Sequence, residues 1–130
     1  MSNLVDEIFG KDKPERYERF RGEYPVRVRG LVNRFGDQTI HDDLDLDVKR
    51  GEILGVVGGS GTGKSVLMRS IIGLQPPDEG RIEVFGQSMT DAEPDEALGV
   101  RNRWGVLFQG GALFSTLTVG ENVEVPLKQF

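Results

Sequence analysis

The stretch Gly58-Gly59-Ser60-Gly61-Thr62-Gly63-Lys64-Ser65 decides how the rest of this sequence is interpreted. It matches the phosphate-binding pattern G-x-x-x-x-G-K-[ST], with Gly58 and Gly63 as its two glycines. An apolar run at 53–57 precedes it and another at 66–72 follows it. A strand, a glycine-rich loop and a helix in this order are the context that the pattern requires. The sequence therefore predicts a loop that binds nucleotide phosphates, rather than a merely flexible Gly/Ser connection.

The residue types in this stretch suit the chemistry of a polyphosphate. Backbone N–H groups approach phosphate oxygens closely only where no Cβ intervenes, which favours glycine. A helix that begins near Lys64 directs its free N–H groups and the positive end of its dipole at the same place. Lys64 adds a charge for the β- and γ-phosphates, and the Ser65 hydroxyl is a ligand for Mg²⁺. The candidate nucleotide-binding residues of the loop are Gly58, Gly59, Ser60, Gly61, Thr62, Gly63, Lys64, Ser65 and Val66.

Length and composition limit the other function classes. The 130 residues suffice for at most one domain, and a net charge of −5 argues against a general nucleic-acid binder. Without cysteine, the chain has no disulfide, no thiol nucleophile and no cysteine metal site. No apolar run approaches the roughly 18 residues that span a membrane. The N-terminus lacks the features of a secretion signal.

The chain before the loop divides into an arm and a pair of strands. Residues 1–24 are mostly charged and are expected to form a loosely packed arm, although 14–20 has the spacing of a short helix. Apolar and polar residues alternate at 26–32 and again at 44–48. These two segments are expected to be half-buried strands that pair antiparallel.

Hydrophobic patterns predict the remaining elements. Three local signals then place the helix ends: Gly73 suits a C-terminal cap, Thr90 and Glu93 have capping-box spacing with Pro94 in the first turn, and Pro126 is expected to interrupt the last helix. The expected strands are 53–57, 81–85 and 104–109, and the expected helices are 64–73, 90–103 and one that starts near 119.

His41 is the only histidine and stands beside Asp42 and Asp43. This trio invites a metal-binding or acid–base interpretation. One histidine next to two solvated aspartates is more typical of an exposed turn, and that is the favoured interpretation.

The position of the loop points to a family. Fifty-seven residues that include two antiparallel strands precede Gly58, an arrangement that resembles the ATPase subunit of ABC transporters. The resemblance implies that Phe35 stacks on adenine, worth about 1–3 kcal/mol by analogy with base stacking, whereas the alternative is a Phe packed beneath its own strand. Residues 73–86 resemble the turn and strand that follow the phosphate-loop helix in this family. Val106-Leu107-Phe108-Gln109 looks like the strand that leads to its Q-loop, which implies that Gln109 reaches Mg²⁺ and the attacking water and couples the site to a membrane subunit.

A narrower resemblance covers about 20 residues near the end of the chain. Residues 107–114 and 117–127 are similar to the ATPases of the Mla and related MCE-type lipid importers, also known as toluene-tolerance proteins. The resemblance implies transport of phospholipid or another hydrophobic compound. It also implies a second ATPase subunit, a permease contacted near the Q-loop, periplasmic MCE-domain and STAS-domain subunits, and a cytoplasmic place on the inner face of the cell membrane. The alternative is another ABC import family with a similar Q-loop region.

The resemblance covers only the first half of an ABC ATPase domain. The family's L-S-G-G-Q signature, its Walker B run ending in Asp-Glu and its later switch histidine do not occur in residues 26–130. The expected fold class is therefore α/β, an incomplete P-loop NTPase core with an N-terminal antiparallel β-subdomain. Residues 1–24 would be the arm and 25–130 the N-terminal half of the ATPase domain. We expect a truncated chain that binds ATP and Mg²⁺ but hydrolyses ATP negligibly.

Two other function classes stay open. One is a non-catalytic module that binds Mg-ATP without hydrolysis. The other is an interaction protein with a vestigial loop, in which 110–127 docks a permease. Small P-loop kinases and GTPases are more distant, because the loop lies far from the start and no guanine-specifying Asn-Lys-x-Asp occurs.

Overall fold

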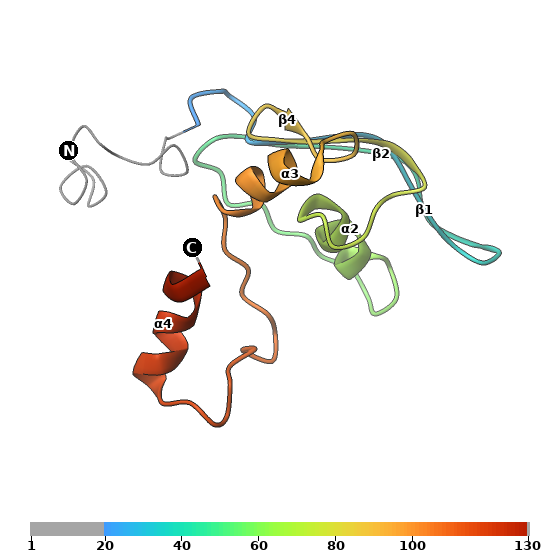
Figure 1. Cartoon of the computed structure of the whole chain (residues 1–130). Coiled ribbons are helices and arrows are strands. Elements are labelled where there is room, and N and C mark those ends of the chain that lie inside the picture. The colour runs from blue at the N-terminus through green and yellow to red at the C-terminus, as the bar shows by residue number, and fades with distance from the viewer. Residues whose placement is uncertain (1–19, 130) are drawn as a thin grey trace.

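A four-stranded antiparallel sheet, with strand order β2-β1-β3-β4, is the scaffold of the computed structural model, which describes residues 20–129 (Figure 1). Its strands are β1 (Val26–Phe35), β2 (Gln38–Val48), β3 (Glu79–Val84) and β4 (Gln87–Ser88). The helices are α2 (Lys64–Ile71), α3 (Pro94–Arg101) and α4 (Val119–Gln129). Figure 1 shows α2 and α3 on one side of the sheet, while α4 stands off it at the end of a long extended segment.

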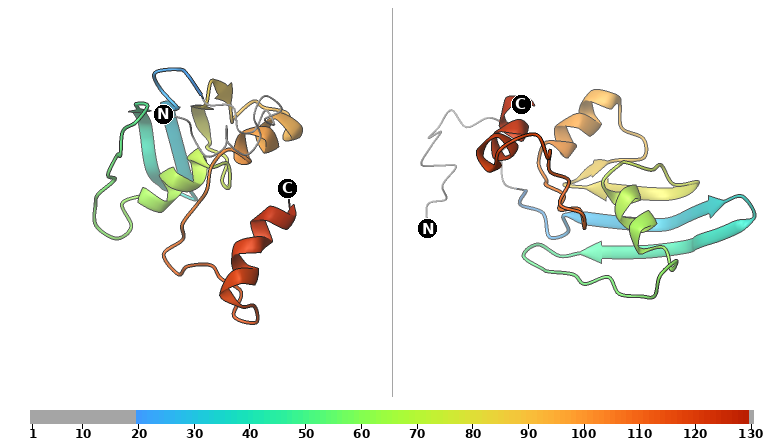
Figure 2. Two further views of the ribbon diagram at one scale, coloured as in Figure 1. Left: turned by 90° about the vertical axis from the view of Figure 1, so that its left-hand side faces the viewer. Right: turned by 90° about the horizontal axis from the view of Figure 1, so that it is seen from below.

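The pairing of β1 with β2 confirms the expected antiparallel strands. Both run further than expected and meet at the two-residue turn Gly36-Asp37, so that they form the long hairpin seen from below in Figure 2. Gly36 has a φ of 57°. A type II′ turn requires this conformation at its first central position, where glycine has no steric cost. The turn places Phe35 at the tip of the hairpin.

One apolar core joins the sheet to the two helices that cover it. Val28, Ile82 and Val84 from the sheet pack with Leu67 of α2 and Val100 of α3, and all five are buried. Burying each such side chain contributes about 1.5–3 kcal/mol relative to exposure. Since Leu67 lies two residues beyond the phosphate-loop motif, the core anchors the helix that starts at the loop.

The expected end of α2 at Gly73 is confirmed in detail. The Gly73 N–H donates to the Ser70 carbonyl at 3.2 Å, and the Leu74 N–H donates to the Arg69 carbonyl at 2.8 Å. These two bonds with Gly73 at a φ of 75° form a Schellman motif.

A capping box does begin α3, but the expected pair, Thr90 and Glu93, is wrong. The helix starts at Pro94, which is in its first turn as expected, so Glu93 is the N-cap and pairs with Glu96. Thr90 lies three residues too early and its hydroxyl contacts Ser88 at 3.1 Å instead. Three-residue spacing recurs by chance in polar stretches, and the position of Pro94 is the stronger signal.

Pro126 lies inside α4 and does not interrupt it, contrary to expectation. The start of this helix is secured by a capping box in which the Thr118 N–H donates to Glu121 at 2.7 Å and the Glu121 N–H donates back to the Thr118 hydroxyl at 3.2 Å. Asn122 adds bonds to both backbone groups of Phe114. Proline removes one helical bond and crowds the carbonyl four residues back, yet α4 continues to Gln129.

Residues 53–57 and 104–109 are not strands, although their apolar patterns predict strands. They run without a hydrogen-bonded neighbour in the described part of the chain. Ile53, Val57 and Leu107 are 99%, 92% and 92% exposed. A strand of a parallel sheet is stable only with neighbours on its edges and cover on its faces. The apolar patterns are those of core strands, but residues 20–129 form no parallel sheet around them.

Part of the expected arm can be located. Residues 1–19, and with them all but the last residue of the helix considered at 14–20, lie outside the described residues. Phe20 contacts the Phe85 ring, with centroids 5.7 Å apart, and the Arg50 N–H donates to the Glu23 carbonyl at 2.8 Å. Residues 20–24 are thus held against the sheet. Within 20–129, no helix is both long and apolar enough to cross a membrane.

Hydrogen exchange should separate the paired from the unpaired parts of this chain. We expect the amides of residues 53–57 to exchange nearly as fast as in an unfolded peptide, and those of Val28 and Ile82 to be protected about 100-fold or more. The measurement is exchange mass spectrometry with peptide resolution on the 130-residue chain. Strong protection at 53–57 would show that the apolar run has found a partner strand.

Candidate nucleotide-binding site

The glycine-rich loop is exposed to solvent, and two of its own side chains hydrogen-bond to its backbone carbonyls. The Lys64 ammonium turns back and donates to the carbonyls of Gly58 and Gly59, at 2.8 Å for Gly59. The Thr62 hydroxyl donates to the same Gly59 carbonyl at 2.8 Å. The Lys64 cation therefore lies over the loop, where a bound anion would compete with the two carbonyls for it.

The start of α2 offers unpaired donors beside this cation. Its N-cap is Gly63, which has no side chain to cap the helix, and no acidic residue stands in the first turn. The first N–H groups of a helix have no partner within it and carry the positive end of the dipole. This helix end therefore suits a phosphate group.

A cavity of ≈ 560 Å³ lies in front of the loop and brings distant residues together. Phe35 reaches it from the hairpin tip and Gln109 from the extended segment after α3. The Phe35 side chain is 48% exposed, which does not fit a ring packed beneath its own strand. The cavity is lined by Phe35, Ile40, Ser60, Gly61, Thr62, Gly63, Lys64, Ser65, Val66 and Gln109.

Nearly all the residues expected from the sequence meet in this cavity. Gly58 and Gly59 lie outside its lining and contribute through the carbonyls that hold Lys64. Ile40 of β2 is a lining residue that sequence reasoning missed. Its apolar side chain carried no functional signal, and only the packing of the loop against β2 brings it to the cavity.

The exposed-turn interpretation of His41 is wrong. His41 lies in β2 and is 8% exposed, and its Nδ1 hydrogen-bonds the Oδ1 of Asn33 at 2.8 Å. Burial lowers the pKa of His41, partly opposed by a hydrogen bond with the backbone of Gly63. No group of three or more acidic, histidine or cysteine side chains gathers as a metal site in residues 20–129. His41 is therefore a buried imidazole behind the loop and not a ligand in front of it.

Gly63 is the point where the loop touches the sheet. Its φ is 96°, and a Cβ built there would lie 2.5 Å from the Cγ2 of Ile40 and 2.7 Å from the Nε2 of His41. Real Cβ contacts are not that short. The second glycine of the motif is thus required by the approach of β2 as well as by its own backbone conformation.

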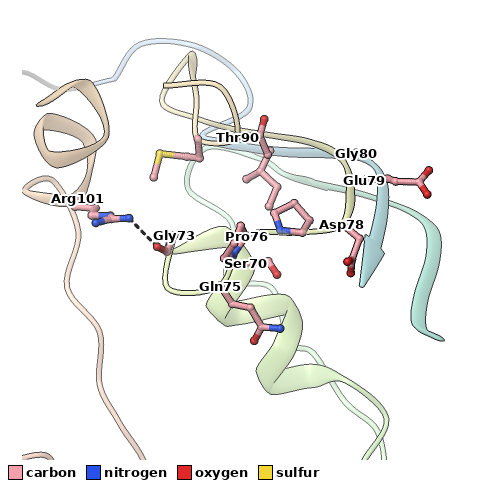
Figure 3. A pocket seen from close by; sticks show the side chains of 12 residues that line it. Ser70, Gly73, Gln75, Pro76, Asp78, Glu79, Gly80, Thr90 and Arg101 are labelled. Atoms are coloured by element: carbon pink, nitrogen blue, oxygen red, sulfur yellow. Dashed lines mark hydrogen bonds between the residues drawn. The ribbon is translucent and has the colours of Figure 1, made fainter. Parts of the chain in front are cut away.

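A second cavity, of ≈ 360 Å³, lies at the far end of α2 (Figure 3). Its charged side chains have protein partners. Arg101 donates to the Gly73 carbonyl at 2.7 Å, Asp78 accepts the Arg34 N–H at 2.6 Å, and Glu79 pairs with the Arg34 guanidinium at 2.8 Å. This cavity supports the packing of α2, α3 and β3 and presents no convergent set of free polar groups.

The family model for the ABC transporter matches residues 41–129, which is more than half of the chain and includes the phosphate loop and Gln109. The chain belongs to the ABC transporter ATPase family. This confirms the resemblance that the sequence motifs carried.

Curated relatives belong to the same family, and their names state different transported substrates. A probable ribonucleotide transport ATP-binding protein of Mycobacterium leprae is 39% identical over 80% of this chain and 30% of its own. A methionine import ATP-binding protein of Rhizobium johnstonii is 44% identical over 82% and 29%. A probable anion import ATP-binding protein of Haloferax volcanii is 44% identical over 98% and 43%. The chain thus spans less than half the length of these relatives.

Solved structures confirm the fold class. An ATP-binding cassette bound to ADP and phosphate in a dimeric post-hydrolysis state has a TM-score of 0.70 at 30% identity, over 80% of this chain and 47% of that one. The cbiO1 subunit of Clostridium perfringens has a TM-score of 0.72 at 27% identity, over 84% and 44%. The described residues are thus part of a P-loop cassette in which the antiparallel β-subdomain is formed.

The contact between Gly63 and β2 can be tested by adding a methyl group at position 63. We expect Gly63→Ala to lower the free energy of unfolding by about 2–4 kcal/mol, because the added Cβ meets two side chains and a positive φ. Urea denaturation followed by Trp104 fluorescence measures the change. Gly59→Ala is the matched control, since its Cβ would meet nothing closer than 4.0 Å. Equal effects at both positions would contradict the interpretation.

Proposed function

We propose that this chain is the ATP-binding part of an ABC transporter subunit and that it binds Mg-ATP in the cavity in front of the loop. The convergence of Phe35, residues 60–66 and Gln109 on one cavity supports this assignment. These groups come from three parts of the chain and have the three chemistries that a nucleotide needs: an aromatic face, a phosphate cradle and an amide. The family membership supports the same proposal.

Each group has a role that follows from its chemistry. The N–H groups at the start of α2 and the Lys64 ammonium bind the phosphates, for which Lys64 leaves the carbonyls of Gly58 and Gly59. The Ser65 hydroxyl and the Gln109 amide oxygen are hard oxygen donors of the kind that suits Mg²⁺ together with phosphate oxygens. Bound Mg²⁺ would neutralise phosphate charge. The Phe35 ring, half exposed at the mouth of the cavity, stacks on the adenine.

Nucleotide titrations test the phosphate and adenine roles separately. We expect Lys64→Ala to weaken binding of a fluorescent ATP analogue about 100-fold, and Phe35→Ala to weaken it about 5–100-fold through lost stacking. Lys49→Ala, which removes a lysine at the far end of β2, should change little. Phe35→Trp should keep most of the affinity, because stacking needs an aromatic face and no particular ring. Unchanged binding in Lys64→Ala would favour the interaction protein with a vestigial loop.

We further propose that the isolated chain does not turn over ATP. Among residues 20–129, no acidic side chain lines the cavity, so none of these residues can orient water there as a carboxylate base. We expect phosphate release by the 130-residue chain to be indistinguishable from that of its Lys64→Ala variant. A magnesium-dependent rate that Lys64→Ala abolishes would overturn this. Whether the whole protein hydrolyses ATP, as the family resemblance implies, or is a non-catalytic Mg-ATP module is tested by assaying the protein in its native length.

The proposal extends to the transported substrate and the partner proteins. The similarity of 107–127 to MCE-type lipid importers supports phospholipid or another hydrophobic compound, with MCE-domain and STAS-domain partners, whereas the named relatives carry other substrates. Phe108, Leu113 and Phe114 are 51%, 74% and 57% exposed and flank the candidate Q-loop glutamine, which supports a permease contact at an inner membrane face. Loss of the gene should then change envelope phospholipid distribution, and a Lys64→Ala copy should not restore it. Altered methionine or anion uptake with unchanged lipids would place the protein in another import class.

A further inference from the structure

A chain of three buried polar side chains runs behind the phosphate loop. His41, Asn33 and Ser70 are 8%, 1% and 2% exposed, and they come from β2, β1 and α2. The Asn33 Oδ1 lies 2.8 Å from the His41 Nδ1, and the Asn33 Nδ2 donates to the Ser70 Oγ at 3.3 Å. None of the three side chains lines the cavity in front of the loop. The nucleotide-binding roles proposed above leave all three unused.

The His41 end of this hydrogen-bonded series faces the loop. The Nε2 of His41 lies behind Gly63, close enough that a Cβ on Gly63 would be 2.7 Å from it. Ser70 lies one residue before the end of α2, whereas Gly63 is the N-cap of the same helix. The polar chain therefore touches the loop at one end of α2 and reaches the helix again at the other end. A buried network of this kind holds its members in one arrangement, because each unpaired group would carry a desolvation cost.

We propose that His41 is a positioning residue of the phosphate loop, which supports Gly63 from behind and, through Asn33 and Ser70, holds α2 in the orientation that binds phosphate. This inference rests on the proposed nucleotide binding and adds a residue to it. His41 touches no nucleotide. It acts through Gly63, whose N–H belongs to the start of the helix on which the phosphates would rest.

The surroundings of His41 make its pKa sensitive to charge bound in front of the loop. The causes of its lowered pKa are burial and the Gly63 backbone, and no charged side chain of the described residues is among them. The charged residues next to His41 in sequence are Asp42 and Asp43 on β2. Lys64 follows Gly63 at the start of α2, and its ammonium is engaged with the loop carbonyls. A polyphosphate in front of Gly63 would add negative charge across one peptide unit in a partly dry environment. That charge favours the imidazolium and raises the pKa of His41.

The single histidine makes a direct measurement possible. The imidazole proton resonances of the full chain are followed by NMR from pH 5 to 8, first alone and then with saturating Mg-ADP. We expect a pKa below the ordinary value for histidine in the free chain and an upward shift with Mg-ADP. A titration that saturating Mg-ADP leaves unmoved would overturn the inference.

Substitutions test the positioning role independently. We expect His41→Phe, which keeps a planar ring of slightly larger size but loses both polar contacts, to weaken Mg-ADP binding about tenfold at a temperature where the variant is folded. His41→Asn, whose amide nitrogen takes about the place of Nδ1, should recover part of this loss through Asn33. Thr39→Val, an exposed position on the same strand, is the control and should bind as the unchanged chain does. Normal affinity in a folded His41→Phe would show that His41 serves stability alone.

The outcomes separate this inference from the function on which it rests. If the unchanged chain does not bind Mg-ADP in a fluorescence titration, the nucleotide site itself is wrong. If it binds Mg-ADP but neither the His41 titration nor the His41→Phe affinity changes, only the role of His41 is wrong. Circular dichroism of each variant confirms that losses of affinity occur in folded protein.

Discussion

The close approach of Gly63 to β2 is the contact on which the candidate site depends. It joins the two bodies that carry the functional groups: the hairpin, which holds Phe35 at its tip, and α2, which begins with Lys64 and Ser65. A side chain at position 63 would separate them, since Ile40 and His41 already occupy the space. Glycine is thus needed here for the distance between two elements as well as for its φ of 96°.

Apolar and polar contacts hold this arrangement in different ways. Leu67 packs with Val28 and Ile82 in the core and presses α2 onto the sheet. Such burial is strong but non-directional, and it permits small rotations of the helix. The hydrogen bonds from Ser70 through Asn33 to His41 are directional and select one rotation. The core therefore keeps α2 on the sheet, and the polar chain aligns its start with the cavity.

The sequence predicted those elements whose signals are local. The phosphate loop, the paired strands, the end of α2 at Gly73 and the first turn at Pro94 all follow from a few neighbouring residues. The capping-box error at Thr90 was itself local, but the errors in the expected strands arise where distant residues decide. Residues 53–57 and 104–109 have the apolar pattern of core strands, yet a strand needs partners, and 20–129 provide none.

His41 shows the same limit at the site itself. Next to Asp42 and Asp43 it looks like part of a solvated turn, because sequence proximity suggests that the three share an environment. Alternation along β2 turns Asp42 to the opposite face, and Asp43 has a φ of 57° where the pairing with β1 is irregular. The fold of α2 over the sheet then buries only the imidazole.

By itself, the sequence determined the chemistry of this protein: a glycine loop, a lysine and a serine at the spacing for phosphate, with an aromatic residue before them and a glutamine after them. Only the tertiary structure decided which other residues share the site. It brought Phe35 and Gln109 to one cavity, placed Ile40 in its wall and set His41 behind Gly63. The reason is physical. The spacing of a phosphate loop is a property of consecutive backbone atoms, whereas a contact between β2 and α2 depends on how the sheet and helix pack, and no short segment of the chain contains that information.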